Sequence, residues 1–252
     1  MKTVLITGCS SGFGLETAKH FLRHGWKVVA TMRSPREELL PTSEHLHVLA
    51  LDVTDPESIR LAVEAAGPID VLVNNAGIGT LNALEGTSID TVREVFEANT
   101  FGTIAMTQAL LPQFRKRNTG AIVNITSSVT LKPLPLLSVY TASKAAVNAF
   151  TESLALELRQ FNVRVSLVLP GRAPETRFGE NSQRRMGGIP DAYSTLAQRT
   201  FEGWRQSTEP VTHTADVVQA VWRAANDPAG PLRLYAGADA VALAEAVGKP
   251  TV

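Results

Sequence analysis

Several features that define other classes of protein are scarce in this sequence. It has one cysteine, Cys9, in 252 residues, which excludes an internal disulfide framework and a zinc cluster built on cysteines. Basic and acidic residues balance at 24 each, so a net charge of zero gives no general attraction to nucleic acid or to an anionic membrane. No apolar run approaches the roughly 18 residues of a membrane span, and the run before Gly8 is too short for a signal peptide. We therefore expect a soluble, cytoplasmic protein without nucleic acid or membrane partners.

The sequence does have ample apolar residues, 44% of the chain, arranged in runs of two kinds. Short continuous runs rich in Val, Ile and Leu are typical of strands covered on both faces. These runs lie at residues 3–7, 26–31, 46–51, 70–74, 121–125, 163–169 and 232–235. Between them, patterns with helical spacing occupy residues 12–24, 56–66, 88–116, 140–161 and 213–226. This alternation predicts an α/β fold with a doubly wound parallel sheet of about seven strands and helices on both faces.

One stretch interrupts the alternation of strands and helices. Residues 172–210, which we call the lid segment, carry Pro174, Gly179, Gly187, Gly188 and Pro190. The segment is too long for an ordinary connection and predicts a functional loop over the substrate with a helix inside it. The chain has neither a Pro/Gly/Ser-rich linker nor a fixed-period repeat, so we expect residues 1–252 to form one domain.

A glycine-rich turn, Thr7-Gly8-Cys9-Ser10-Ser11-Gly12-Phe13-Gly14, follows the first predicted strand. Glycine lets backbone approach a ligand, and the following helix N-terminus offers N–H groups and partial positive charge to a phosphate. The order strand, glycines, helix suits dinucleotide binding, although the spacing is neither Gly-x-Gly-x-x-Gly nor a Walker A loop. A structural turn is one alternative. A hydrolase elbow with Ser10 as nucleophile is another, but seven residues before Gly8 leave no room for the strand and loop it needs.

Tyr140 and Lys144 stand four residues apart, on one face of a predicted helix. An ammonium group nearby favours tyrosinate and lowers the tyrosine pKa, so the pair can pass a proton to a developing alkoxide. By itself this spacing is equally typical of an amphipathic helix start. Ser127 and the Asn74–Gly77 motif, however, end two predicted strands, at the sheet edge where parallel sheets bind ligands.

Together these motifs resemble the short-chain dehydrogenase/reductase family, in its branch of about 250 residues. The matches occur in family order between residues 3 and 171 and comprise the glycine turn, Asp52, Asn74–Gly77, Asn99, Ser127, Tyr140, Lys144, Pro170 and Gly171. The resemblance implies a Rossmann-like fold and an enzyme that interconverts a carbonyl compound and an alcohol with a nicotinamide cofactor. A sugar-nucleotide epimerase of the longer branch and a non-catalytic dinucleotide-binding regulator are the alternatives.

The resemblance also implies a role for each matching residue. Tyr140 would be the general acid in reduction, Ser127 (or Ser128 beside it) would hydrogen-bond the substrate oxygen, and Lys144 would lower the tyrosine pKa and hold the nicotinamide ribose. Asn99 would bind a water that relays protons to Lys144. The cofactor would contact Gly8, Ser10, Ser11, Gly12, Phe13, Gly14, Arg33, Asp52, Val53, Asn75, Ala76, Gly77, Tyr140, Lys144, Pro170, Gly171 and Thr176. Phe13 replaces a usual Ile, and Thr176 comes one residue later than in the family.

The residues after the second predicted strand favour NADP(H) over NAD(H). An NAD enzyme typically has an acid about 20 residues past the glycines to bind the ribose 2′-hydroxyl. Met32 takes that place here and Arg33 follows, with Arg36 near enough to assist. A guanidinium attracts the 2′-phosphate that a carboxylate repels. Arg33 as a solvated surface residue, and with it an NAD(H)-dependent alcohol dehydrogenase, is the alternative.

Further residues bear on substrate and assembly. Leu131, Leu134, Leu136 and Leu137 lie between Ser127 and Tyr140 and predict an apolar wall of a pocket for a small-molecule substrate, unless they pack the lid segment instead. Small residues along 140–161 permit close helix packing, and the resemblance implies a homodimer or homotetramer through this helix and the one before it. His20 and His24 stand four apart, but no carboxylate completes a metal site, so we expect surface histidines and no metal.

Overall fold

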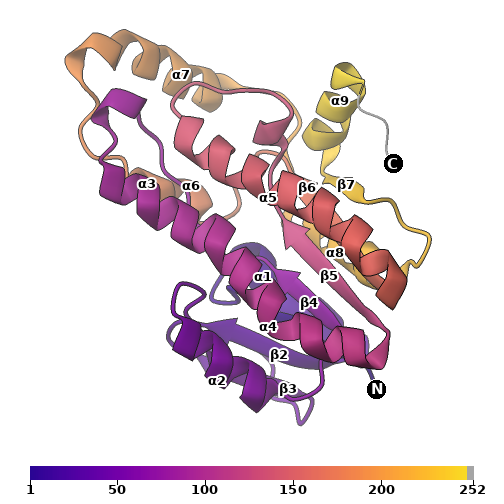
Figure 1. Cartoon of the computed structure of the whole chain (residues 1–252). Helices are drawn as coiled ribbons and strands as arrows, with labels where there is room; N and C mark the ends of the chain where they lie inside the picture. The colour runs from indigo at the N-terminus through magenta and orange to yellow at the C-terminus, as the bar shows by residue number, and fades with distance from the viewer. Residues whose placement is uncertain (249–252) are drawn as a thin grey trace.

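A computed structural model describes residues 1–248 of the chain and places the seven predicted strands in one sheet (Figure 1). The strands are β1 (Thr3–Ile6), β2 (Lys27–Met32), β3 (Leu46–Ala50), β4 (Val71–Asn74), β5 (Gly120–Ile125), β6 (Val163–Pro170) and β7 (Arg233–Ala236). Their order is β3-β2-β1-β4-β5-β6-β7, and every neighbouring pair is parallel. Each strand begins and ends within one residue of its predicted bounds. The last four residues of the predicted domain 1–252 lie outside the described residues.

Helices cover both faces of the sheet, as the continuous apolar strands predict. Helices α1 (Gly12–Arg23) and α8 (Thr214–Asn226) cover one face, and α2 (Pro56–Ala66), α4 (Gly102–Arg117) and α5 (Ser138–Leu158) cover the other. Successive residues of β1 enter different cores: Val4 and Ile6 pack on the α1 side and Leu5 on the α4 side. All three are fully buried, which stabilises the fold by about 1.5–3 kcal/mol for each side chain.

The prediction of a single long helix over residues 88–116 is wrong in one respect. The structure has α3 (Ile89–Phe96), a π-helical segment at Glu97–Phe101, and then α4. Ser88 caps α3 by accepting a hydrogen bond from Thr91 N at 3.1 Å. The wider π turn contains Asn99, and such turns are frequent at functional sites.

Helix α5 begins at Ser138, two residues before its predicted start, so Tyr140 lies in its first turn. The helical backbone ends at residue 161, where the helical pattern in the sequence also ends. A 3-10 turn over Arg159–Phe161 follows α5, and Asn162 then adopts the left-handed conformation with φ of 52°. Asparagine tolerates this conformation better than most residues, which explains why the helix ends here and β6 begins.

The lid segment holds two α-helices rather than the one predicted. They are α6 (Phe178–Gln183) and α7 (Ser194–Gln206), and both lie beyond the carboxyl ends of the strands (Figure 1). Arg185 docks the segment on α3 through a 3.0 Å ion pair with Glu94. Asn82 Nδ2 donates to Met186 O and, at 2.9 Å, to Gly86 O. The lid segment is therefore packed against the connection that follows β4.

Helix α9 (Ala238–Val247) has no counterpart in the sequence prediction. It is rich in alanine and buries Ala240 and Ala244, the latter in a small core with Leu131, Leu167 and Leu169. None of the helices within residues 1–248 combines the length and apolar content needed to cross a membrane.

The prediction of surface histidines is wrong for His20. This side chain is buried, and its ring centroid lies 5.1 Å from that of Trp222 and 4.2 Å from that of His24. Burial lowers the pKa of His20, and the nearby His24 lowers it further. In the part of the chain that the structure describes, no three His, Cys, Asp or Glu side chains gather in a way that could hold a metal ion.

Candidate active site

The glycine turn after β1 is locked to the end of β4. Gly8 has φ of 75°, and Asn75 Nδ2 donates to Thr7 O at 2.8 Å and to Gly8 O at 3.2 Å. A Cβ atom on Gly14 would lie 2.5 Å from Asn75 Nδ2 and from Gly8 O. Since real side chains do not tolerate such distances, this position requires glycine.

The N-terminus of α1 has the features of a phosphate site. Its N-cap residue, Ser11, makes no side-chain capping bond, and the first turn contains no acidic residue. The first N–H groups of the helix are therefore available to an anion, with the helix dipole favouring negative charge. A Cβ atom on Gly12 would lie 3.6 Å from the methyl carbon of Thr176, so the lid segment brings Thr176 over this turn despite its one-residue offset.

The connection after β4 provides the next part of the site. The Thr7 hydroxyl accepts hydrogen bonds from Asn75 N at 3.0 Å and from Ala76 N at 2.9 Å. A Cβ atom on Gly77 would lie 3.0 Å from Asn99 Oδ1 and 3.2 Å from Lys144 Nζ. The lack of a side chain at Gly77 thus leaves room for the lysine, a physical reason that the motif alone does not reveal.

Asn99 holds this connection against α5. Its Oδ1 atom accepts from Ile78 N at 2.7 Å, and its Nδ2 atom donates to Ile78 O at 2.9 Å and to Ser143 Oγ at 3.0 Å. The amide therefore uses both of its hydrogens within the protein. Asn99 lies at the site as expected, and the contacts of its side chain are those of a positioning residue.

Ser127 and Tyr140 meet beyond the end of β5. Both are buried, with 8% and 6% of their surface exposed, and the Ser127 side chain lies near enough to affect the pKa of Tyr140. Burial raises the pKa of Tyr140 above the ordinary value of 10, although the Ser127 side chain acts in the opposite direction. The predicted direction, a pKa lowered by the lysine, is therefore wrong for this structure, because loss of solvent around the phenol outweighs the other effects.

Lys144 lies one helical turn after Tyr140 and is equally buried. Its Nζ atom donates to Ile125 O at 3.0 Å, at the end of β5. Burial lowers the pKa of Lys144 from 10.5 to about 8. The ammonium form therefore loses its proton close to neutral pH, which is typical of lysines at functional sites.

Basic residues gather where the adenosine end of a dinucleotide is predicted. Met32 is buried, whereas Arg33 is exposed, and Arg36 Nη2 donates to Ser10 O at 3.1 Å. Burial raises the pKa of Asp52, but hydrogen bonds from Thr54 and the charge of Arg33 outweigh it, so the pKa lies below its usual value. The structure thus brings Arg33 near Asp52 and Arg36 to the glycine turn. Val53 packs against the start of α4 at Gly102.

The apolar residues between Ser127 and Tyr140 divide between two roles. Leu134 and Leu137 pack in a cluster with Leu81 and Tyr140, which Met186 and Trp204 of the lid segment complete. Leu131 and Leu136 pack instead in two other cores. The Phe178 ring lies 5.2 Å from the Tyr140 ring. Tyr140 is therefore packed among part of the leucines and side chains of the lid segment.

Sequence reasoning missed the residues that hold the end of β6. Pro170 ends the strand, and Gly171 N donates to the Thr212 hydroxyl at 2.8 Å. Asp239, in the first turn of α9, accepts from Arg172 N at 2.6 Å. In the sequence, the local feature that could have indicated this close packing is Gly237, directly before α9.

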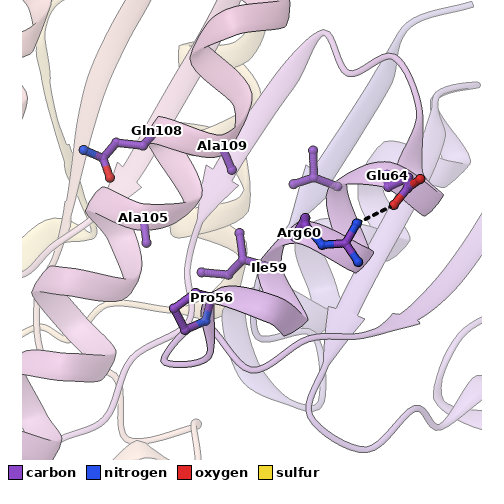
Figure 2. Close-up of a pocket in the computed structure, with 8 residues that line it drawn as sticks. Pro56, Ile59, Arg60, Glu64, Ala105, Gln108 and Ala109 are labelled. Atoms are coloured by element: carbon purple, nitrogen blue, oxygen red, sulfur yellow. Dashed lines mark hydrogen bonds and ion pairs between the residues drawn. The ribbon is translucent and has the colours of Figure 1, made fainter.

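A hollow of about 670 Å³ lies apart from these residues, between α2 and α4 (Figure 2). It is lined by Pro56, Ile59, Arg60, Val63, Glu64, Ala105, Gln108 and Ala109. Arg60 and Glu64 form an exposed ion pair at 2.9 Å, which contributes little free energy. None of the predicted site residues is among those that line it, so we assign the chemistry to the sheet edge.

Known proteins resemble this chain in sequence over most of its length. The sequence model of the family described as short chain dehydrogenase matches residues 2–186. Retinol dehydrogenase 8 of Homo sapiens is 37% identical over 255 residues, which cover 92% of this chain and 80% of that protein. The Bos taurus protein of the same name is 43% identical over 182 residues, which cover 68% of this chain and 58% of that protein. Estradiol 17-beta-dehydrogenase 1 of Rattus norvegicus is 35% identical over 250 residues, covering 92% and 72%. The matches thus span between 58% and 80% of these relatives' lengths.

Solved structures are similar over nearly the whole chain. A short-chain dehydrogenase from Streptomyces avermitilis has a TM-score of 0.84 at 34% identity and covers 97% of this chain and 91% of its own. A closed serine dehydrogenase complexed with NADP+ has a TM-score of 0.79 at 30% identity, covering 93% and 94%. A 3-ketoacyl-(acyl-carrier-protein) reductase from Brucella melitensis complexed with NADH has a TM-score of 0.78 at 26% identity. The match covers 94% of this chain and 96% of that protein. Similar proteins therefore bind both kinds of nicotinamide dinucleotide.

The contacts at Gly14 lead to a test of the glycine turn. In Gly14→Ala the added methyl group would meet Asn75 Nδ2 and Gly8 O, so we expect unfolding to become easier by about 1–3 kcal/mol. Guanidinium denaturation measures the change. Gly203→Ala is the matched control, because Gly203 lies in α7 with open space around its Cβ position. A Gly14→Ala protein as stable as wild type would show that the turn is not packed as described.

The burial of Lys144 leads to a test through stability. Its folded-state pKa of about 8 lies below 10.5, so the unfolded chain binds the proton more readily between these pH values. Wild-type stability should therefore rise as the pH increases across this window. Lys144→Met removes the buried charge, and we expect it to be more stable than wild type by about 3 kcal/mol at pH 7, with the difference shrinking towards pH 10.

Denaturant titrations at several pH values measure this difference. Lys116→Met, at the exposed end of α4, controls for the loss of a lysine charge. A Lys144→Met protein less stable than wild type at pH 7 would contradict the description of Lys144 as a costly buried ammonium.

Proposed function

The chain belongs to the short-chain dehydrogenase family of oxidoreductases, and on that premise we propose that it interconverts a bulky apolar carbonyl compound and its alcohol with NADP(H). The observation that carries the proposal is the buried Tyr140 hydroxyl, which lies near enough to Ser127 for that side chain to affect its pKa and stands one helical turn before Lys144. These groups lie at the edge of the sheet where the glycine turn also ends. Ligands of open parallel sheets bind at this edge.

The residues present suit a nicotinamide dinucleotide that carries a 2′-phosphate. The uncapped N-terminus of α1 would hold the pyrophosphate, and Arg33 and Arg36 would hold the 2′-phosphate. Lys144, which lies beside Gly77, would hold the ribose of the nicotinamide half. When bound, the nicotinamide supplies or accepts a hydride. Binding of NADP+ by the similar serine dehydrogenase supports this assignment.

Proton transfer falls to Tyr140. Burial raises its pKa, so the phenol keeps its proton across the neutral range and can donate it to the oxygen of a carbonyl substrate. Ser127 would donate a hydrogen bond to the same oxygen and stabilise its developing charge. The Lys144 ammonium would stabilise the phenolate that remains. In the reverse direction the tyrosinate form of the same group would take the proton from the alcohol.

The substrate side is apolar, which supports a bulky hydrophobic carbonyl compound. Leu81, Leu137 and Met186 surround Tyr140, and Phe178 packs on its ring. Such a lining offers hydrophobic contact and few polar partners. The names of the relatives, retinol dehydrogenase 8 and estradiol 17-beta-dehydrogenase 1, agree with an apolar substrate. We assign residues 172–210 the role of a lid over it.

The proposal includes a homodimer or homotetramer. Ala142, Ala145 and Ala149 are exposed along one face of α5, and Leu156 is 62% exposed on the same helix. Small side chains let a second helix approach closely, and the exposed leucine would be buried by a second copy of this chain.

Tyr140→Phe tests the assigned acid. The variant lacks the proton that completes reduction, so we expect turnover of a retinoid or steroid carbonyl compound to fall by at least about 10³-fold. NADPH binding, measured by fluorescence, should change little. Tyr235→Phe is the matched control, since the buried Tyr235 hydroxyl has no hydrogen-bond partner to lose among residues 1–248. Undiminished turnover in Tyr140→Phe would remove the tyrosine from the mechanism.

Arg33→Asp tests the choice of cofactor. Replacing the guanidinium by a carboxylate would repel the 2′-phosphate, and we expect the ratio of kcat/KM for NADPH over NADH to fall by about 10–100-fold. Arg60→Asp, an equal change of charge on α2, should leave the ratio unchanged. If Arg33→Asp also keeps the wild-type ratio, the NADP(H) preference is wrong and the NAD(H) alternative stands.

A further inference from the structure

The first residue of the lid segment is held at three points. Arg172 N donates to Asp239 Oδ2 at 2.6 Å, and Arg172 O accepts from Thr212 N at 2.8 Å. The guanidinium reaches across to the end of α7, where Nη1 donates to Trp204 O at 3.1 Å. The backbone at the start of the lid segment is thus tied to α9 and to the residues that precede α8.

The Thr212 hydroxyl lies at the centre of these contacts. It accepts a hydrogen bond from Gly171 N at 2.8 Å, and its own proton can go to Asp239 Oδ1 at 2.7 Å or to Ala236 O at 2.8 Å. Thr212 is fully buried. The two carboxylate oxygens of Asp239 therefore face one donor at the start of the lid segment, Arg172 N, and one just beyond its end, the Thr212 hydroxyl. The same hydroxyl lies within hydrogen-bond distance of Ala236 O in β7.

Two glycines make room for this arrangement. A Cβ atom on Gly171 would overlap the Asp239 carboxylate, and a Cβ atom on Gly237 would overlap the Thr212 side chain. Gly237 also has φ of 99°, a conformation that other residues rarely adopt. A carboxylate that only capped α9 would need neither glycine. Its position in the first turn of α9 adds the attraction of the helix dipole.

Residues a short distance along the lid segment contact the candidate site. Thr176 lies over Gly12, four residues after Arg172, and Phe178 packs on the Tyr140 ring, two residues later. Because Arg172 is the point from which this stretch leaves the sheet, its orientation determines where both side chains lie. A shift at Arg172 would therefore move contacts at both the phosphate turn and the acid.

We propose that Asp239 and Thr212 are positioning residues that clamp the hinge of the lid segment, so that the C-terminal helix α9 controls how firmly ligands are held. The clamp itself is a statement about the fold, and its effect on catalysis rests on the proposed function. Neither residue touches the reacting atoms. Loss of the clamp should open the lid segment and weaken binding, with the proton-transfer groups left in place.

Limited proteolysis of the full chain tests the clamp without reference to activity. The lid segment contains Arg177, Arg184 and Arg199, so trypsin cleavage there, mapped by mass spectrometry, reports its opening. Asp239→Asn and Thr212→Val should raise the cleavage rate by about 10-fold, the factor expected for one lost charge-assisted hydrogen bond. Thr212→Ser keeps the hydroxyl and should cleave at the wild-type rate, as should Asp227→Asn at the far end of α8.

Kinetics with NADPH and an apolar carbonyl compound form the second arm. The same two variants should raise KM for NADPH by about 10-fold with kcat within about twofold of wild type. If the wild-type protein oxidises no NADPH with any such substrate, the proposed function is refuted. The proteolysis experiment then still tests whether Asp239 and Thr212 hold the lid segment. Wild-type cleavage rates in both Asp239→Asn and Thr212→Val, or equal rates in Thr212→Val and Thr212→Ser, would overturn the clamp. The comparison of Thr212→Ser with Thr212→Val tests the clamp even if Asp239→Asn does not fold.

Discussion

The candidate site depends on keeping an ammonium group out of water. Lys144 is 5% exposed, and its one recorded hydrogen bond within residues 1–248 goes to Ile125 O. Burying a charge with so little compensation is costly, so nothing about the stability of the fold explains a lysine at this position. Gly77 leaves the space, Asn99 holds the connection that contains Gly77, and α5 brings the lysine to the end of β5. These features are understandable together if the charge acts on a bound ligand.

The parallel sheet explains how distant residues come to surround that charge. Every strand of the sheet points the same way, so the turns after β1, β4 and β5 meet at one edge. Hydrogen bonds then join the turns. The Thr7 hydroxyl accepts from Asn75 N, after β4, and the Asn75 side chain donates to Thr7 O at the start of the glycine turn. The proposed phosphate site is therefore held directly to the connection that follows β4. The lid segment contributes apolar side chains around Tyr140. Helix α9 holds the start of that segment through the bond from Arg172 N to Asp239.

Much of this could be predicted from the sequence, and the exceptions share a cause. The strands were predictable because burial on both faces produces continuous apolar runs that end where the sheet ends. The π segment at Glu97–Phe101 was missed because it leaves the apolar pattern of the helix nearly unchanged, and α9 because its alanines show little amphipathic contrast. The raised pKa of Tyr140 and the roles of Thr212 and Asp239 depend on contacts across the lid segment and between distant parts of the chain. No local pattern contains them.

The most direct measurement follows one hydrogen from cofactor to product. NADPH deuterated at the transferring position of the nicotinamide is mixed with the wild-type protein and an apolar aldehyde or ketone, and the product is analysed by mass spectrometry. We expect an alcohol that carries deuterium on its carbinol carbon, while its hydroxyl hydrogen comes from Tyr140 and exchanges with water. An alcohol without deuterium, or no alcohol from any such carbonyl compound, would contradict the assignment of this site to hydride transfer.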